Sequence, residues 1–209
     1  MKKFALLAAA LVAAAPVLSA QTGTLTFVNG GSVNDGHYYV GNYNATLDGA
    51  PITVNCVDFF HEVNNGDVWT VNETSLLGGN LSNTRLGNTG LDTYEQAAFL
   101  TYQYTGKSNG DIVDIQHAIW RLFGATDPNL VSSGSDTWLA FANTNFATSG
   151  FDYSHYTVLT DTRVHDGVTP DDQTKQEFLT TTTTPEPSSI ALLGTGLFGL
   201  IPMVRRRKR

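Results

Sequence analysis

Hydrophobic and polar residues alternate along much of the chain before residue 72 and after residue 155. Alternation over about four to eight residues is typical of a β-strand with one buried face. In the stretch 51–60, for example, Val54 and Cys56 fall on one face and Asn55 on the other. The pattern predicts strands over residues 24–31, 37–46, 51–60, 68–71, 156–160 and 176–179, and a loop over residues 72–91.

The middle of the chain has a helical period instead. Apolar residues recur at spacings of three and four from Ile112 to Leu122, and Gly124 follows as a stop signal. Helices separating two groups of strands indicate an α+β protein, a β-sandwich or barrel with a helical insertion of two to three helices. The predicted helices cover residues 94–103, 111–123 and 135–145, the first capped by Asp92 or Thr93 and the third by Ser135 or Asp136.

The N-terminal residues resemble a targeting segment rather than part of a fold. Lys2 and Lys3 precede an apolar stretch that ends in Ser19 and Ala20, the arrangement of a secretory signal peptide over residues 1–20. An uncleaved N-terminal anchor is the alternative. The following residues, 21–179, have a length that suits one exported domain and is short for two. A Thr-rich linker over residues 180–184 ends this part of the chain.

The C-terminal segment, residues 185–209, has three parts. Pro185, Glu186 and Pro187 come first, an apolar run to Val204 follows, and five basic residues end the chain. The apolar run is near the lower limit for a transmembrane helix, and the basic residues are expected to stay cytoplasmic. These parts resemble the PEP-CTERM sorting signal of Gram-negative bacteria. The resemblance implies recognition and removal of the tail by an exosortase, a membrane-embedded cysteine protease-transpeptidase, whereas a permanent anchor would leave the Pro-Glu-Pro motif unexplained.

The predicted exported domain is strongly acidic. The whole chain has 12 Lys and Arg residues against 19 Asp and Glu residues. Seven of the cationic residues and one of the acids lie in residues 1–20 and 185–209, which leaves 5 against 18 and a net charge of −13. Such a surface repels nucleic acids and anionic lipids, so nucleic-acid binding is excluded.

Cys56 is the only cysteine in the sequence. An exported protein with one cysteine has no internal disulfide. Three interpretations remain open: a buried inert thiol, an intermolecular disulfide, or a cysteine with chemistry of its own.

Most catalytic and metal-binding motifs are absent from the sequence. It has no His-Glu-x-x-His, no Gly-x-Ser-x-Gly and no phosphate-binding glycine loop. The five histidines lack metal-ligand spacing, and Asp166, Asp171 and Asp172 lack the spacing of a calcium loop, which favours a solvated acidic turn. The sequence therefore predicts a protein that is not an enzyme and uses no metal or cofactor.

Two short segments carry a more specific signal. Residues 55–59, Asn-Cys-Val-Asp-Phe, end a predicted strand, and residues 115–120, Ile-Gln-His-Ala-Ile-Trp, lie on a predicted helix. Over residues 38–124 the chain resembles the thioester domain of bacterial surface adhesins. The resemblance implies that the Cys56 thiol and the Gln116 side chain condense with loss of ammonia into an internal thioester. Asp58, Trp120 and His117 are then the supporting residues.

A thioester is an activated acyl group, because a thiolate leaves far more readily than an amide nitrogen. A lysine amine or a sugar hydroxyl could attack the Gln116 carbonyl once, without turnover, and form a covalent link. The expected protein passes the inner membrane, reaches the cell surface or extracellular matrix, and attaches to a surface protein or polysaccharide. The alternative is a non-covalent structural or carbohydrate-binding component of an exopolysaccharide or biofilm matrix, with Cys56 simply buried.

Overall fold

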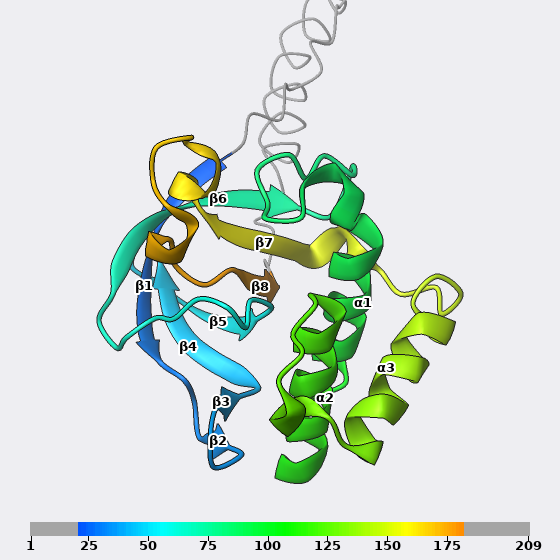
Figure 1. Ribbon diagram of the computed structural model, residues 1–209. Coiled ribbons are helices and arrows are strands. Elements are labelled where there is room, and N and C mark those ends of the chain that lie inside the picture. The colour runs from blue at the N-terminus through cyan, green and yellow to red at the C-terminus, as the bar shows by residue number, and fades with distance from the viewer. Residues whose placement is uncertain (1–20, 182–209) are drawn as a thin grey trace, which may run out of the picture.

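Six antiparallel strands close into a barrel in the computed structural model, which describes residues 21–181 (Figure 1). The strands follow the order β1-β4-β5-β8-β7-β6 around the barrel, with an additional two-stranded hairpin of β2 and β3. Their bounds are β1 Gln21–Asn29, β2 Val33–Asn34, β3 Tyr39–Val40, β4 Asn42–Leu47, β5 Ala50–Cys56, β6 Val68–Ser75, β7 Tyr156–Asp161 and β8 Phe178–Thr181. The predicted choice between sandwich and barrel is therefore resolved as a barrel.

Three α-helices lie together on one side of the barrel (Figure 1). They are α1 (Leu91–Tyr102), α2 (Asn109–Leu122) and α3 (Ser133–Asn145), and all three are inserted between β6 and β7. This arrangement confirms the predicted α+β class with a helical insertion. Short 3-10 helices are η1 Gly87–Gly90, η2 Pro128–Leu130, η3 Tyr153–His155, η4 Thr162–His165 and η5 Asp171–Gln173.

The predicted ends of the chain lie outside the described residues. The signal peptide, the PEP-CTERM segment with its apolar run and most of the linker are not among residues 21–181. Within that range, no helix combines the length and the apolar character that crossing a membrane requires.

Several element ends differ from the prediction. β6 continues to Ser75 inside the segment expected to be a loop, and β5 stops at Cys56 rather than near residue 60. α1 begins without a side-chain cap. α3 is capped by Ser132, whose hydroxyl oxygen accepts a hydrogen bond from the Ser135 backbone amide. A cap must precede the first free amides of the helix, so a polar residue already within the first turn is in the wrong place for it.

Helix α2 divides the apolar interior into two parts. Ile115 and Ile119 pack in a cluster between the barrel and the helices. Trp120 instead enters the barrel cluster, which also contains Cys56 and Phe178. Fully burying an apolar side chain contributes about 1.5–3 kcal/mol, so both faces of α2 hold the helix against the barrel. Gln116 contacts both clusters, because its side chain bonds to Tyr104 of the first and to the backbone of Cys56 of the second.

Candidate functional site

Cys56 occupies the last position of β5, where its side chain is fully buried. Its backbone pairs with Phe178 of β8, and the next amide, that of Val57, donates to the Glu177 carbonyl. The Cys56 sulfur donates to the Asp58 backbone carbonyl at 3.1 Å. The indole nitrogen of Trp120 donates to the same sulfur at 3.4 Å. Strand pairing on one side and helix α2 on the other therefore fix the position of the thiol.

The Gln116 carboxamide, also fully buried, has partners for both of its ends. Its nitrogen donates to the Cys56 backbone carbonyl at 2.8 Å. Its oxygen accepts from the Tyr104 hydroxyl at 2.8 Å and from the Gly41 amide at 3.3 Å. The structure thus brings together Cys56 and Gln116, which are sixty residues apart in sequence.

Gly41 is required at its position for two reasons. Its φ of +84° lies in the left-handed region that favours glycine. A β-carbon added there would lie 2.7 Å from the Ile112 side chain on α2. The close approach of this backbone to α2 is what directs the Gly41 amide toward Gln116.

Burial dominates the ionisation of the Cys56 thiol. It raises the pKa of Cys56 to about 12, the Asp58 charge adds to the rise, and the Trp120 hydrogen bond opposes it. Burial, with the nearby Cys56 charge, also raises the pKa of Tyr104 well above its ordinary value. Both groups are therefore protonated at neutral pH, so Tyr104 remains a hydrogen-bond donor.

Two donors aimed at one carbonyl oxygen form the arrangement of an oxyanion hole. Tyr104 and Gly41 polarise the Gln116 carbonyl and would stabilise negative charge on its oxygen during attack at the carbon. The sulfur of Cys56, the nucleophile available in this part of the structure, has its own donor in Trp120. The arrangement suits acyl transfer between the carboxamide carbon and sulfur. The sequence pattern identified neither Tyr104 nor Gly41 as a site residue, because both contacts depend on the tertiary fold.

The two-residue period of a strand over residues 51–60 predicts that Asp58 lies on the same face as Cys56, and the structure corrects this. β5 has already ended, and the Asp58 backbone rather than its carboxylate contacts the sulfur. The carboxylate lies 2.8 Å from the Arg85 Nε and 2.7 Å from the His61 Nδ1. Asp58 therefore supports the thiol through the path of its backbone.

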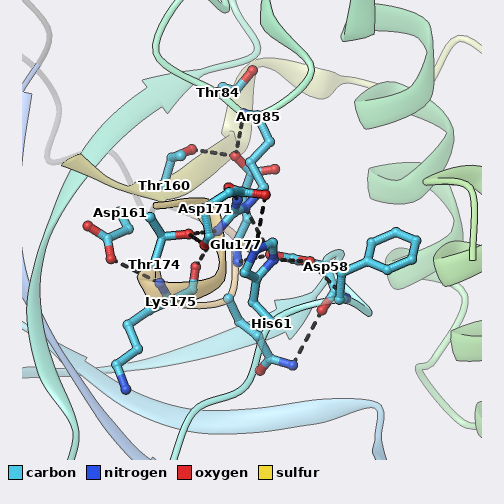
Figure 2. A network of polar contacts seen from close by, with 12 residues as sticks. Asp58, His61, Thr84, Arg85, Thr160, Asp161, Asp171, Thr174, Lys175 and Glu177 are labelled. Carbon is cyan, nitrogen blue, oxygen red and sulfur yellow. Dashed lines mark hydrogen bonds and ion pairs between the residues drawn. The ribbon is translucent and has the colours of Figure 1, made fainter. Parts of the chain in front are cut away.

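Arg85 is the centre of a polar network beside the end of β5 (Figure 2). In addition to Asp58, its guanidinium contacts the carboxylate of Asp171 at 2.7 Å and the hydroxyl of Thr174 at 2.7 Å. Its backbone amide donates to Glu177 at 2.9 Å. The network links the loop after Cys56 to the segment before β8. Asp171, placed by sequence in an acidic turn, is thus an ion-pair partner.

Glu177 is a fully buried carboxylate next to Arg85. It accepts from the hydroxyls of Tyr94 and Thr160, both at 2.5 Å. Burial raises its pKa despite these bonds. The sequence carried no sign of this residue's importance, because a Glu within a short strand pattern is normally solvent-exposed.

The contribution of His61 to the stability of the network depends on pH. The Asp58 hydrogen bond is the main cause that raises the pKa of His61, aided by the Asp58 and Asp171 charges and opposed by burial and by Arg85. A raised folded-state pKa stabilises the fold fully below the unfolded value of about 6.5, and the contribution is lost as pH rises through the folded value.

We expect His61→Gln to remove this part of the pH dependence. The wild-type free energy of unfolding should fall as pH rises above about 6.5, whereas the variant should show a smaller fall. Urea unfolding across that pH range measures both. His155→Gln is the matched control, since His155 is 63% exposed at its side chain and faces an exposed Asp152. Equal pH slopes in His61→Gln and wild type would contradict the assignment.

His117 and Trp120, the other predicted supporting residues, lie on α2 and stack with ring centroids 6.0 Å apart. The His117 Nε2 is 2.7 Å from the Asp35 carboxylate, at the turn of the β2–β3 hairpin. Trp120 reaches the sulfur, whereas His117 holds the hairpin on the helix. His117 is therefore one contact further from the Cys56 thiol than Trp120.

Comparison with known proteins identifies the C-terminal segment. Residues 183–209 match the family model described as the PEP-CTERM protein-sorting motif. No curated protein and no solved structure matches the chain. The protein therefore carries a sorting signal recognised by exosortase, and it is an exported protein with a C-terminal membrane-transit signal. The resemblance of residues 38–124 to thioester domains stays a prediction.

Proposed function

We propose that Cys56 and Gln116 form an internal thioester through which the exported protein attaches covalently to a surface or polymer. One observation carries the proposal: the Gln116 carboxamide is held between an oxyanion hole and the cysteine. Its oxygen has two donors, Tyr104 and Gly41, and its nitrogen contacts the Cys56 carbonyl at 2.8 Å. The residue whose backbone carbonyl this nitrogen contacts also carries the one thiol of the sequence.

Thioester formation transfers the Gln116 acyl group from nitrogen to sulfur. The Cys56 sulfur attacks the Gln116 carbonyl carbon, a C–S bond forms, and the C–N bond breaks. The thiol proton leaves with the amide nitrogen as ammonia. Because the raised pKa keeps the thiol protonated, polarisation of the carbonyl by Tyr104 and Gly41 is the activating contribution.

Attachment to a target is a second acyl transfer, in which the incoming nucleophile takes the place that the amide nitrogen left. Loss of ammonia leaves the Cys56 backbone carbonyl without the donor that the Gln116 nitrogen supplied. An incoming amine or hydroxyl can donate its hydrogen to this carbonyl while attacking the acyl carbon. The acyl–sulfur bond then breaks, and the proton passes to the Cys56 sulfur. Full burial of both residues keeps water away and slows hydrolysis.

Intact mass of the exported protein tests the proposal. The folded wild type should be one ammonia lighter than its sequence, and methylamine should add its own mass while releasing one titratable thiol. Cys56→Ala and Gln116→Ala should both have full sequence mass and no reaction with methylamine. Gln96→Ala, which changes a half-buried glutamine on α1, should retain the deficit. A folded wild type with full mass and a free thiol would overturn the proposal.

A second candidate is non-covalent carbohydrate binding, and one observation favours it. A cavity of about 630 Å³ next to Trp120 is lined by aromatic and amide side chains. This volume lies within the range of about 300–1,000 Å³ found for small-molecule sites.

A further inference from the structure

The cavity opens at one end of the barrel. Its walls come from three separate segments: the chain after β1, the β2–β3 hairpin and the loop between β5 and β6. Tyr43 and Trp120 also line it. Since the Trp120 indole nitrogen contacts the Cys56 sulfur, this one side chain borders both the cavity and the proposed thioester.

Aromatic rings form a connected apolar wall. Trp120 contacts Tyr38 and Phe59 with ring centroids 5.7 Å and 5.2 Å apart. Tyr39, on the hairpin, lines the same cavity and is 59% exposed. An exposed aromatic face next to a concave site is suited to stacking on the apolar face of a sugar ring.

The polar lining of the cavity includes His37 and His61, and the His61 imidazole is already paired with the carboxylates of Asp58 and Asp171. The other polar side chains supply hydrogen bonds and one carboxylate. Asn64, Asn65 and Gln176 contribute amides, and Glu62 contributes a carboxylate. In the described part of the chain, neither Glu62 nor Asn65 has a side-chain hydrogen bond. The acidic residue at the cavity and the net charge of −13 over residues 21–184 favour a neutral or cationic ligand and repel an acidic one.

We propose that this cavity binds an amino-sugar oligosaccharide, with the sugar ring on Tyr39 and the cavity aromatics and its amine near Glu62. The covalent part of this inference rests on the proposed thioester. A second amine of the same oligosaccharide, uncharged and not paired with Glu62, attacks the Gln116 carbonyl carbon, a C–N bond forms, the C–S bond breaks, and the amine proton passes to the Cys56 sulfur. The product is an amide link between Gln116 and the polymer. Binding itself needs no thioester.

Binding is measured with Cys56→Ala, which cannot form the thioester, by titrating glucosamine oligomers and following tryptophan fluorescence or heat. We expect saturable binding that weakens at least tenfold in Tyr39→Ala and in Glu62→Gln, each made in the same background. Tyr39→Phe should retain binding because it keeps the stacking face. Tyr102→Ala, which removes an exposed tyrosine from α1, is the matched control and should bind normally. Galacturonic acid oligomers should bind at least tenfold more weakly.

Covalent capture separates the two proposals. Wild type incubated with the glucosamine oligomer should gain one oligomer mass, and Tyr39→Ala should gain it more slowly at subsaturating oligomer. Binding by Cys56→Ala without an adduct on a wild type of full sequence mass would support the cavity and overturn the thioester. Adduct formation at equal rates in wild type, Tyr39→Ala and Glu62→Gln would overturn the cavity proposal. Equal or tighter binding of the N-acetylated oligomer would overturn the amine assignment.

Discussion

Replacing Tyr104 with Phe should slow thioester formation by about 10²–10³-fold while leaving the fold intact. Tyr104 donates to the Gln116 oxygen at 2.8 Å, whereas the remaining donor, the Gly41 amide, lies at 3.3 Å. The shorter hydrogen bond carries the larger share of carbonyl polarisation. Timed intact-mass measurements after refolding follow ammonia loss, and the rate of methylamine addition reports on the same oxyanion hole.

The control variant is Tyr102→Phe, two residues away on an exposed side chain. It should form the thioester at the wild-type rate. Because Tyr104→Phe loses one neutral hydrogen bond, its free energy of unfolding should fall by about 1 kcal/mol, so folding does not account for a hundredfold loss of rate. A wild-type rate in Tyr104→Phe would exclude the tyrosine from the chemistry.

Replacing Arg85 with Ala should lower the free energy of unfolding by about 3–5 kcal/mol. The Asp58 carboxylate is 3% exposed, and removing the guanidinium leaves this charge buried with His61 as its remaining cationic partner. The contacts to Thr174 and Asp171 are lost as well. The backbone bond from residue 85 to Glu177 is kept, so the change isolates the side chain. Urea denaturation measures the effect.

Asp171→Ala provides the comparison within the same network. Its carboxylate is 71% exposed, so breaking its pair with Arg85 should cost less than about 1 kcal/mol. The comparison tests whether the burial of Asp58, rather than the number of ion pairs, determines the loss in the free energy of unfolding. Similar losses in Arg85→Ala and Asp171→Ala would refute that explanation.

The sequence predicted which segments form strands and helices better than it predicted how the strands close into a barrel. Two-residue alternation and three- or four-residue spacing located the barrel strands and α1, α2 and α3, because burial imposes those periods. The choice of barrel depended on β8, a four-residue strand that pairs with both β5 and β7. Such pairing between distant segments leaves no local pattern.

The residues of the candidate site likewise divide into those that the sequence identified and those that only the tertiary fold brings together. Cys56 and Gln116 were singled out because residues 55–59 and 115–120 resemble the thioester domain of surface adhesins, and the single cysteine of an exported chain agreed with that resemblance. Tyr104 and Gly41 were not found, since their role is set by where a loop and a hairpin meet α2. Arg85 was missed for a related reason: it lies in a segment without a period, and its partners are distant in sequence.

The first and last strands run in opposite directions relative to the cavity. β1 runs toward the cavity, where Asn29 lines the rim, and β8 runs away from it, starting just after the rim residue Gln176. Gln21 and Thr181, the first and last described residues, therefore lie at the ends of β1 and β8 that point away from the cavity rim. Neither end of the described chain therefore obstructs the entrance to the cavity, which leaves the entrance open to a ligand longer than the cavity itself.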